Sequence, residues 1–428
     1  MQETFLHFIW QYQYFDKHNL TTTSGVSVNI VSSGHSNHDA GPDFGNSKIV
    51  IGRIKWAGNV EIHIKSSDWY AHHHEIDKGY DNVVLHVVWE FDKPVYRTDG
   101  SEIPTLELKS RIDPLLINNS DRLVNSTKSI PCSNQFPAIK NLSKQSMMDR
   151  VLAERLQRKA KEVMEVHERT NGNWEECAYV LLCKNFGFKT NAQPFEQLAR
   201  ALPIKVLRKH SNTLLQIEAL LFGQAGFLDK ISNDYQQELE YEYRFLAHKY
   251  KLEENKLNKE QWKFARLRPA NFPTIRLAQL SVILKNSTNL FASLIALRNF
   301  KEVEKLFKED LSSYWTSHYQ FGEESVKKIA SIGKSSIENI IVNTIVPLLV
   351  AYGKSIDDQS LVDKAVLLLE STAPEKNKIT RNWDVLGEKA MSAYSSQAQI
   401  ELFNNYCLQK KCLKCVIGLQ ILKKKAIM

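Results

Sequence analysis

The segment Asn59-Val-Glu-Ile-His-Ile-Lys65 alternates apolar and polar side chains, which is the pattern of a strand buried on one face. Its apolar residues are expected to point into a core, and Glu61, His63 and Lys65 to stand in a row on the other face. Asp43 lies in Gly41-Pro42-Asp43-Phe44, just before the neighbouring predicted strand. If the two strands pair, the carboxylates of Asp43 and Glu61 converge, with a histidine and a lysine beside them.

Such a group of side chains suits a divalent cation. Mg²⁺ or Mn²⁺ would be held by the carboxylates of Asp43 and Glu61. His63 or Lys65 would then orient water or stabilise charge on a phosphoryl transition state. If His63 itself binds the metal, Mn²⁺ or Zn²⁺ fits better than Mg²⁺. The plain alternative is that these side chains form the solvated face of a half-exposed strand.

The elements around this segment predict an α+β chain. A helix is expected over 3–15, strands over 26–31, 48–52, 59–65 and 83–89, a helix over 68–80, and further strands near 95–96 and 105–108. Beyond about residue 115 nearly every periodic segment is helical, with Gly and Pro between the segments. We therefore predict a small α/β domain over 1–115 (helix, three strands, helix, strand), a linker over 116–140, and an all-helical domain over 141–428.

Pro42-Asp43 followed by Glu61-Ile62-His63, within this element order, resembles the PD-(D/E)xK nuclease superfamily over residues 1–92. The resemblance implies metal-dependent cleavage of phosphodiester bonds in DNA or RNA, with Asp43 and Glu61 as metal ligands. The lysine of the motif is replaced by His63, and Lys65 is two residues further on. Either residue takes the lysine's role, or the site is degenerate and the protein is a non-catalytic scaffold that binds nucleic acid or protein.

Three consecutive histidines, His72, His73 and His74, lie in the predicted helix over 68–80. Adjacent residues do not share a helix face, so at most one or two of them are expected at the site. His74 is our candidate, with His72 as the alternative and Asp77 nearby. A third hypothesis is a metal-dependent hydrolase of a smaller substrate that uses His63, His74 and His86 together.

The cysteines Cys407, Cys412 and Cys415 have C-x₄-C-x₂-C spacing, and Cys132, in a loop, could complete a set of four. This spacing is used by iron–sulfur sites, and Zn²⁺ also accepts four cysteines. Some helicase-associated and CRISPR-associated nucleases of the superfamily look similar in pairing one lone cysteine with three clustered ones. In those proteins the lone cysteine precedes the nuclease core, whereas here it follows. The alternative is ordinary reduced thiols.

The net charge of +8 is uneven, with −4 over residues 1–131 and +12 over the remainder. Basic excess is compatible with a nucleic-acid partner or with a lysine-rich solvated surface. Arg266, Arg268 and Arg276 flank a rigid Asn-Phe-Pro turn and are candidates for phosphate contacts. They could equally pair with the acidic residues of 238–254.

No membrane span is predicted, because the apolar run 340–352 is short and contains Asn343, Thr344 and Pro347. We expect a buried helix there, and the few cysteines and the lack of a basic leader predict a cytoplasmic protein. The chain as a whole is similar to an uncharacterised bacterial family, domain of unknown function 2851. The resembling segments are Gly41-Pro-Asp-Phe44, Val60-Glu-Ile-His63, Asp68-Trp69, Arg266-Leu-Arg-Pro-Ala-Asn-Phe-Pro273 and the terminal cysteines. That similarity brings no activity with it.

Overall fold

The computed structural model describes residues 2–37 and 39–423. The chain forms two compact units, which we describe separately: one runs to Met147 and resumes at Leu402, and the other is Met148–Glu401. The first unit contains the mixed sheet and the second is mostly helical, so the predicted α+β class is confirmed. The final segment from Leu402 belongs to the first unit, whereas the sequence analysis placed it in the helical domain.

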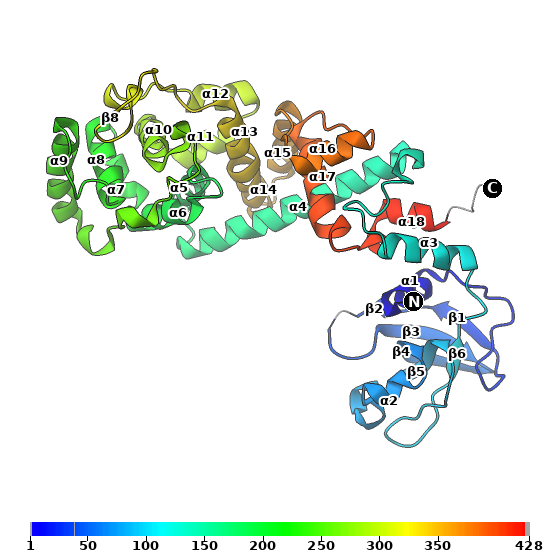
Figure 1. Ribbon diagram of the computed structural model, residues 1–428. Helices are drawn as coiled ribbons and strands as arrows, with labels where there is room; N and C mark the ends of the chain where they lie inside the picture. The colour runs from blue at the N-terminus through cyan, green and yellow to red at the C-terminus, as the bar shows by residue number, and fades with distance from the viewer. Residues whose placement is uncertain (1, 38, 424–428) are drawn as a thin grey trace. The chain divides into compact units, whose positions relative to one another are not determined.

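The first unit is built on one mixed sheet (Figure 1). Its strand order is β1-β3-β4-β5-β6, with β2 also paired to β3. The pairs β1–β3 and β3–β4 are antiparallel, whereas β4–β5 and β5–β6 are parallel. The elements are α1 (Glu3–Tyr12), β1 (Val28–Ser32), β2 (His35–Ser36), β3 (Phe44–Ile51), β4 (Ile54–Lys65), α2 (Asp68–Ala71), the 3₁₀ turns η1 (His74–Ile76) and η2 (Lys78–Tyr80), β5 (Val83–Glu90) and β6 (Thr105–Glu107).

The two sides of this sheet are covered by different segments. All residues of β5 from Val83 to Val88 are buried, as expected for a strand of a parallel pair that is covered on both faces. Helix α1 packs against β4, and the segment α2–η2 lies on the opposite side of the sheet (Figure 1). Trp69 of α2 is fully buried and forms a small core with Val83, Val95 and Ile103. One face of the end of β4 is therefore covered by α2.

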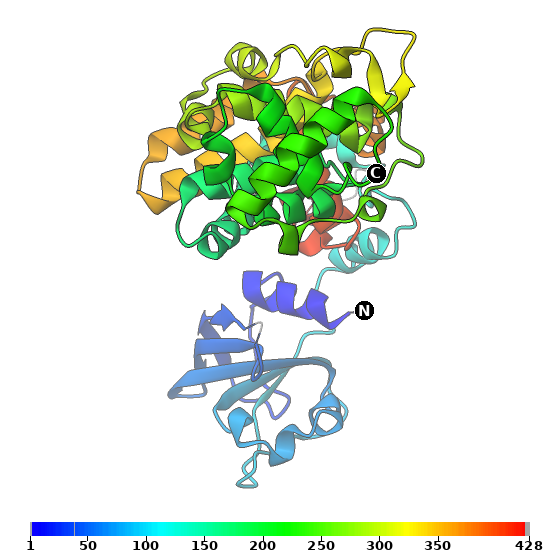
Figure 2. The same cartoon turned by 90° about the vertical axis from the view of Figure 1, so that its left-hand side faces the viewer.

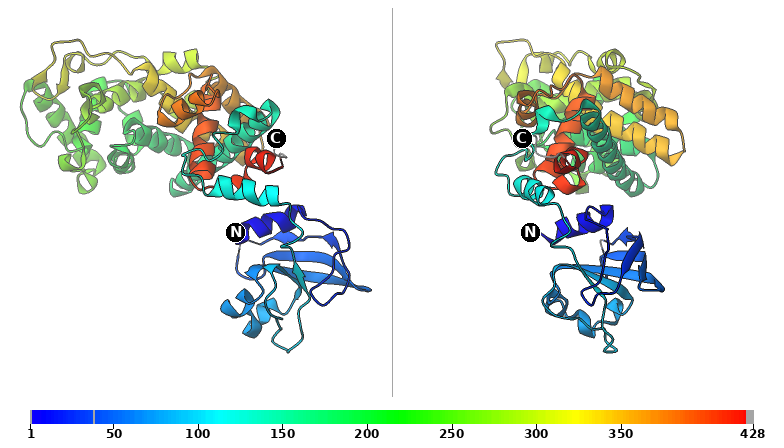
Figure 3. Two further views of the ribbon diagram at one scale, coloured as in Figure 1. Left: turned by 45° about the vertical axis from the view of Figure 1, so that its right-hand side comes forward. Right: turned by 90° about the vertical axis from the view of Figure 1, so that its right-hand side faces the viewer.

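The stretch 116–140, predicted to be a linker, contains most of helix α3 (Pro114–Val124). Asp113 caps α3 by accepting a hydrogen bond from the Leu115 N–H, and Pro114 occupies its first turn. Helix α3 packs beside α18 (Val416–Lys423), as Figure 3 shows. Its apolar partner thus comes from the far end of the chain, which a local reading of a Ser- and Asn-rich stretch does not reveal. The same region holds η3 (Phe136–Ala138), the π-turn η9 (Phe403–Cys407) and η10 (Cys412–Lys414).

The second unit is mostly helical (Figure 2), and its helix α10 (Pro273–Asn286) packs against several neighbouring helices. Every residue of α10 from Pro273 to Leu284 is buried, which is typical of a helix enclosed on all sides. The other elements are α4 (Asn141–Arg169, which begins in the first unit), α5 (Trp174–Phe186), α6 (Ala192–Ala201), α7 (Ile204–Arg208), α8 (Leu214–Gln224), α9 (Asp234–Tyr250), η4 (Glu253–Asn255), η5 (Lys259–Gln261), η6 (Pro269–Asn271), α11 (Leu290–Ala296), α12 (Phe300–Phe307), η7 (Tyr314–Thr316), β7 (His318–Gln320), β8 (Glu323–Glu324), α13 (Lys334–Ile340), η8 (Ile341–Ile345), α14 (Val346–Ser355), α15 (Gln359–Ser371), α16 (Lys378–Val385) and α17 (Ala393–Leu402).

The apolar run 340–352 lies in one continuous helical stretch, Lys334–Ser355. This stretch is long and apolar enough to cross a membrane by composition, but 78% of its most apolar window is buried inside the unit. A π-turn at Ile341–Ile345 precedes Pro347, which lies in the first turn of α14. Because proline has no N–H to donate, the wider turn accommodates it without ending the helix. The stretch is thus a core helix of this unit, as expected for a buried segment.

Candidate functional site

Strand β4 presents Glu61 and His63 on one face, and the parallel register of β5 places His86 beside Glu61. The alternation of β4 therefore does what the sequence predicts for these two side chains. Their exposed fractions are only 5% for Glu61, 1% for His63 and 0% for His86. These residues form a buried polar cluster and not a solvated strand face, which removes the plain alternative considered for the sequence.

Asp43 and Glu61 are brought together by reciprocal hydrogen bonds. The Asp43 N–H donates to Glu61 Oε2 at 3.0 Å, and the Ile62 N–H donates to Asp43 Oδ2 at 3.0 Å. The Glu61 carboxyl is thereby held by the backbone just before β3, and the Asp43 carboxyl is held by the backbone of β4. The pairing of β3 with β4, through Phe44 opposite Val60, sets this register. The expected convergence of Asp43 and Glu61 is present.

The predicted helix over 68–80 is broken at His73, which has a left-handed backbone conformation with φ 61°. Helix α2 ends at Ala71 and η1 begins at His74, so the expectation of one continuous helix is wrong. The break turns the side chains on either side of it toward β4. His72 Nδ1 lies 3.0 Å from His63 Nε2, and His74 stacks on His63 with ring centroids 5.4 Å apart. Two of the three histidines therefore reach the site.

The cluster offers three imidazole nitrogens to a metal ion, and a Glu61 oxygen lies beside two of them. One nitrogen each from His63, His72 and His74 lie within 4.8 Å of one another. Glu61 Oε1 lies 3.4 Å from His74 Nε2 and 3.7 Å from His63 Nε2. Two nitrogen or oxygen ligands of one tetrahedral ion with bonds of about 2.0–2.1 Å are roughly 3.3 Å apart. The separation of His63 Nε2 from His72 Nδ1, 3.0 Å, and the distances of Glu61 Oε1 from His74 and His63 are close to this value.

The protonation of the cluster also suits metal binding. Burial, reinforced by the neighbouring histidines, lowers the pKa of His63 to about 2. Burial, with His74 adding to it, lowers the pKa of His86 to about 3. Both imidazoles are therefore neutral near pH 7 and keep a lone pair for a metal or a hydrogen bond. Burial raises the pKa of Glu61, although a hydrogen bond from His74 opposes that change.

Aromatic rings hold the imidazoles in place. Tyr80 stacks on His74 with ring centroids 3.7 Å apart. The buried ring of Trp69 lies 5.2 Å from His74 and 5.5 Å from His86. His86 Nε2 is in turn 2.9 Å from His63 Nδ1. His63 therefore has a hydrogen-bond partner on the side opposite His72, and its ring orientation is fixed from both sides.

His7 and Glu3 of α1 belong to the site, and the sequence analysis missed them. His7 Nε2 lies 3.3 Å from Asp43 Oδ2 and 3.7 Å from Glu3 Oε1. Burial alone would lower the pKa of His7, but the hydrogen bond and charge of Asp43 outweigh burial and raise it. The available signal was the four-residue spacing of Glu3 and His7, which puts both on one helix face.

Lys65 is not brought to the cluster. Its side chain is exposed, and within residues 2–37 and 39–423 its ammonium makes no hydrogen bond or ion pair with Asp43 or Glu61. The strand ends there, and the Lys65 N–H donates to Asp68 Oδ2 at 2.9 Å. Asp77 is likewise exposed, and it accepts a hydrogen bond from the Gly79 N–H. Lys65 and Asp77 therefore do not lie in the cluster with Asp43 and Glu61, where we expected them from the sequence.

The four predicted cysteines gather in the first unit. Cys132, Cys407, Cys412 and Cys415 are all buried and line one cavity of about 20 Å³. Burial and the neighbouring thiols raise the pKa of Cys132 and of Cys412 to about 12, and they also raise the pKa of Cys407.

The backbone around the four cysteines is tightly packed. A Cβ on Gly418 would lie 2.1 Å from the Cys412 carbonyl oxygen, so only glycine allows α18 to approach the cysteine turn this closely. The other two cysteines, Cys177 and Cys183, are buried core residues of α5.

The three arginines proposed for phosphate contacts differ in exposure. Arg266 and Arg268 are exposed, whereas Arg276 is only 5% exposed, inside the second unit. They do not form one surface patch. Arg276 instead lines a cavity of the second unit.

Comparison with known proteins gives a family and no activity. A family model described as "Protein of unknown function (DUF2851)" matches residues 3–378, and the chain therefore belongs to this family. No curated protein and no solved structure gives a significant match to the chain.

Proposed function

We propose that this member of the DUF2851 family is a metal-dependent phosphodiesterase that cleaves nucleic acid at the cluster around β4. The observation that carries the proposal is the convergence of Glu61 with three imidazoles, of which His63 and His74 are buried, next to Asp43. The resemblance of Pro42-Asp43 and Glu61-Ile62-His63 to the PD-(D/E)xK motif supports the choice of substrate. The element order of the sheet is compatible with that resemblance.

The donor atoms fit a borderline divalent ion better than Mg²⁺. Glu61, His63, His72 and His74 would hold it, and imidazole nitrogens favour Mn²⁺ or Zn²⁺ over Mg²⁺. Asp43 remains a candidate ligand through Oδ1, which has no partner among the described residues. A bound divalent ion polarises a phosphoryl oxygen and lowers the pKa of a bound water.

His86 has the position of a residue that orients a metal ligand. If His63 Nε2 is the ligand atom, the ring proton is on Nδ1 and is donated to His86 Nε2, 2.9 Å away. Ligating histidines commonly donate their second N–H in this way, which fixes the tautomer and the ring plane. We therefore assign His63 to metal binding, and not to the lysine's role in the motif.

The lysine's role is better matched by His7. Its pKa is raised beside Asp43 and Glu3, so it carries positive charge in a larger share of molecules than an ordinary histidine. Its side chain is 27% exposed, although the Nε2 atom that faces Asp43 is itself buried. His7 would bind the scissile phosphate and stabilise charge that develops on it.

A cleavage assay on the full chain tests the proposal. Single-stranded and duplex DNA and RNA are each incubated with Mg²⁺, Mn²⁺ or Zn²⁺, using wild type, Glu61→Gln and the exposed control Glu254→Gln. We expect cleavage by wild type and by the control, with a loss of about 100-fold or more in Glu61→Gln because a metal ligand is weakened. Absence of cleavage by wild type on every substrate and metal would overturn the proposal.

A second candidate function is hydrolysis of a smaller phosphoester, favoured by the three convergent imidazoles. Hydrolysis of bis(p-nitrophenyl) phosphate without cleavage of any polynucleotide would favour it. The remaining alternative, a non-catalytic scaffold, predicts nucleic-acid or protein binding with no metal and no hydrolysis. The cleavage assay, extended to bis(p-nitrophenyl) phosphate and combined with measurements of bound metal and of binding, separates all three.

For the four cysteines we propose a structural metal site. A cavity of about 20 Å³ has room for one ion, which favours Zn²⁺ over an iron–sulfur cluster. Metal binding would remove the cost of gathering four buried thiols, because it stabilises their thiolate forms. Zinc without visible absorption after anaerobic purification is the expected result. Brown protein that contains iron would reverse the choice of metal. Purified protein that contains neither zinc nor iron would refute the metal site.

A further inference from the structure

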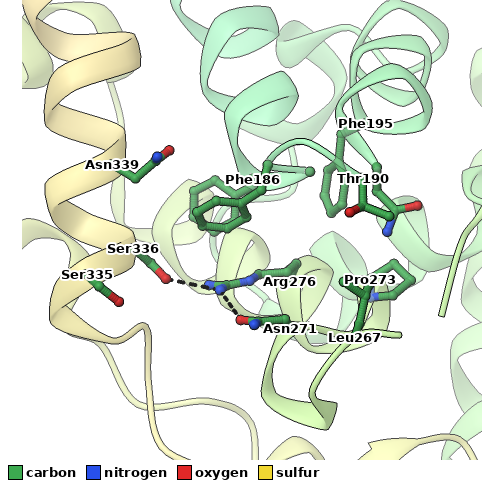
Figure 4. Close-up of a pocket in the computed structure, with 13 residues that line it drawn as sticks. Phe186, Thr190, Phe195, Leu267, Asn271, Pro273, Arg276, Ser335, Ser336 and Asn339 are labelled. Atoms are coloured by element: carbon green, nitrogen blue, oxygen red, sulfur yellow. Dashed lines mark hydrogen bonds between the residues drawn. The ribbon is translucent and has the colours of Figure 1, made fainter. Parts of the chain in front are cut away.

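The second unit contains a cavity of about 290 Å³ beside the buried Arg276. Arg276 lies in the first turns of α10 and reaches between η6 and α13 (Figure 4). Its guanidinium contacts Asn271 and Ser336, which also line the cavity. None of this belongs to the cluster around β4, so the inference is independent of the proposed nuclease.

The positive charge of Arg276 has no counter-ion in the described part of the chain. Its N–H groups donate to three neutral oxygens: Gln279 Oε1 at 2.9 Å, Asn271 Oδ1 at 2.6 Å and Ser336 Oγ at 3.0 Å. Its Nε is buried without a hydrogen-bond partner. Burial alone lowers the pKa of Arg276 to about 10, with no carboxylate opposing it. The side chain is nevertheless charged near pH 7.

A buried, uncompensated guanidinium is costly, and proteins normally pair such a group with an anion. Phe188 covers one face of this guanidinium, with its ring centroid 4.4 Å away, but a cation–π contact does not neutralise the charge. Because no carboxylate of the described residues 2–37 and 39–423 lines the cavity, we look for the missing anion in a bound ligand.

The rest of the lining is suited to an oxyanion. Its polar members are neutral amides and hydroxyls, and the Asn339 side-chain amide has no hydrogen-bond partner among the described residues. The cavity also borders the N-terminal turn of α10 at Pro273, where the helix dipole favours negative charge.

The loop on the other side of the cavity is fixed. A Cβ on Gly187 would lie 2.2 Å from the Asn191 backbone oxygen, so the loop packs closely there. Asn191 in turn exchanges two hydrogen bonds with the Lys263 backbone, which leaves this wall preformed.

We propose that this cavity binds a compact ligand with a terminal phosphate, either inorganic phosphate or a phosphomonoester, and that Arg276 and Asn339 contact the phosphate oxygens. Arg276 suits this role because its planar donors match phosphate geometry. The proposal places the phosphate contact of Arg276 inside the second unit, and not on an exposed surface with Arg266 and Arg268.

Isothermal titration calorimetry on the full chain tests this, with inorganic phosphate, phenyl phosphate and, at matched ionic strength, acetate. We expect saturable binding of at least one phosphate compound by wild type, and no saturable binding of acetate. Inorganic phosphate alone would identify the free ion as the ligand, whereas tighter binding of phenyl phosphate would identify a monoester.

Two variants and one control separate binding from folding. Arg276→Met should abolish phosphate binding, and Asn339→Ala should weaken it by about 3- to 10-fold with an unchanged melting temperature, because its amide has no structural partner. The exposed Arg381→Met changes the net charge equally and should bind as wild type does. No phosphate binding by wild type, preference for acetate, or unchanged binding in both Asn339→Ala and a folded Arg276→Met would overturn the proposal.

Discussion

The histidine cluster on β4 and the buried carboxyl of Glu218 on α8 are both polar groups enclosed in their units, but they are satisfied differently. Glu218 is fully buried and accepts hydrogen bonds from Tyr235 Oη, from Ser281 Oγ at 3.3 Å and from Ser312 Oγ at 3.0 Å. Each contact pairs a hydroxyl donor with a carboxyl acceptor. Such a network is complete without any added group.

The β4 cluster instead gathers three imidazoles beside one carboxyl group. The facing atoms are imidazole nitrogens of His63, His72 and His74 and an oxygen of Glu61, and the low pKa of His63 excludes a second proton on that ring near neutral pH. A cation can accept lone pairs from the three imidazoles at once, whereas each hydrogen bond among them needs one ring to present its N–H. The difference teaches that several neutral imidazoles gathered beside a carboxyl group favour a bound cation more than a carboxyl surrounded by hydroxyl donors does.

The largest expected effect comes from His63→Ala, which removes the central imidazole of the cluster. We expect metal affinity and cleavage to fall by about 100-fold or more, because a first ligand contributes more than the 10–100-fold typical of its supporting partners. Nuclease rates measured across a metal titration check this. The exposed control His248→Ala should cleave as wild type does. If His63→Ala also cleaved as wild type does, His63 would not be a metal ligand.

A smaller loss is expected for His86→Gln, which removes the imidazole that orients His63. Metal affinity should fall by about 10–100-fold, while saturating metal restores most of the activity. Metal titrations followed by cleavage separate these two outcomes. A loss that high metal does not restore would show that His86 acts in the reaction itself.

The variant Glu218→Gln tests the hydrogen-bonded carboxyl of α8 through the pH dependence of protein stability. Burial raises the pKa of Glu218 from 4.5 to about 7, against the opposing hydrogen bonds of Tyr235, Ser312 and Ser281. Between pH 4.5 and about 7, Glu218 binds more protons in the folded state than in the unfolded state. Its contribution to the free energy of unfolding therefore falls as pH rises from 4.5 toward 7 and is constant above that.

Glu218→Gln should remove that fall, which amounts to about 3 kcal/mol at most. Urea unfolding of wild type, Glu218→Gln and Glu254→Gln at several pH values measures it. Parallel pH profiles for Glu218→Gln and wild type would show that Glu218 titrates normally in the folded protein.

The smallest effect is expected for Lys65→Ala. Because its ammonium lies outside the cluster, we expect cleavage to change by less than about threefold, within the range of a screened surface charge. Steady-state rates at two salt concentrations test this. A drop comparable to that of His63→Ala would return Lys65 to the lysine's role in the motif.

The sequence allowed the alternation of β4, the approach of Asp43 to Glu61 and the buried helix near Pro347 to be predicted, because each depends on local spacing. The site's other members depend on backbone detail and on distant packing. The left-handed His73 turns His72 and His74 inward, and nothing in the local sequence predicts it, since a residue other than glycine seldom adopts a positive φ. The contact of His7 with Asp43 and the packing of α3 on α18 join segments far apart in the chain.

The most direct test of the central claim is the metal content of the purified full chain, measured by elemental analysis with X-ray absorption at the metal's edge. Wild type is compared with His63→Ala/His74→Ala and with Cys412→Ser/Cys415→Ser. We expect the histidine variant to lose about one ion with nitrogen and oxygen ligands and to keep any sulfur-bound metal. Wild type without an ion bound by nitrogen and oxygen, or the same ion retained by the histidine variant, would contradict the account.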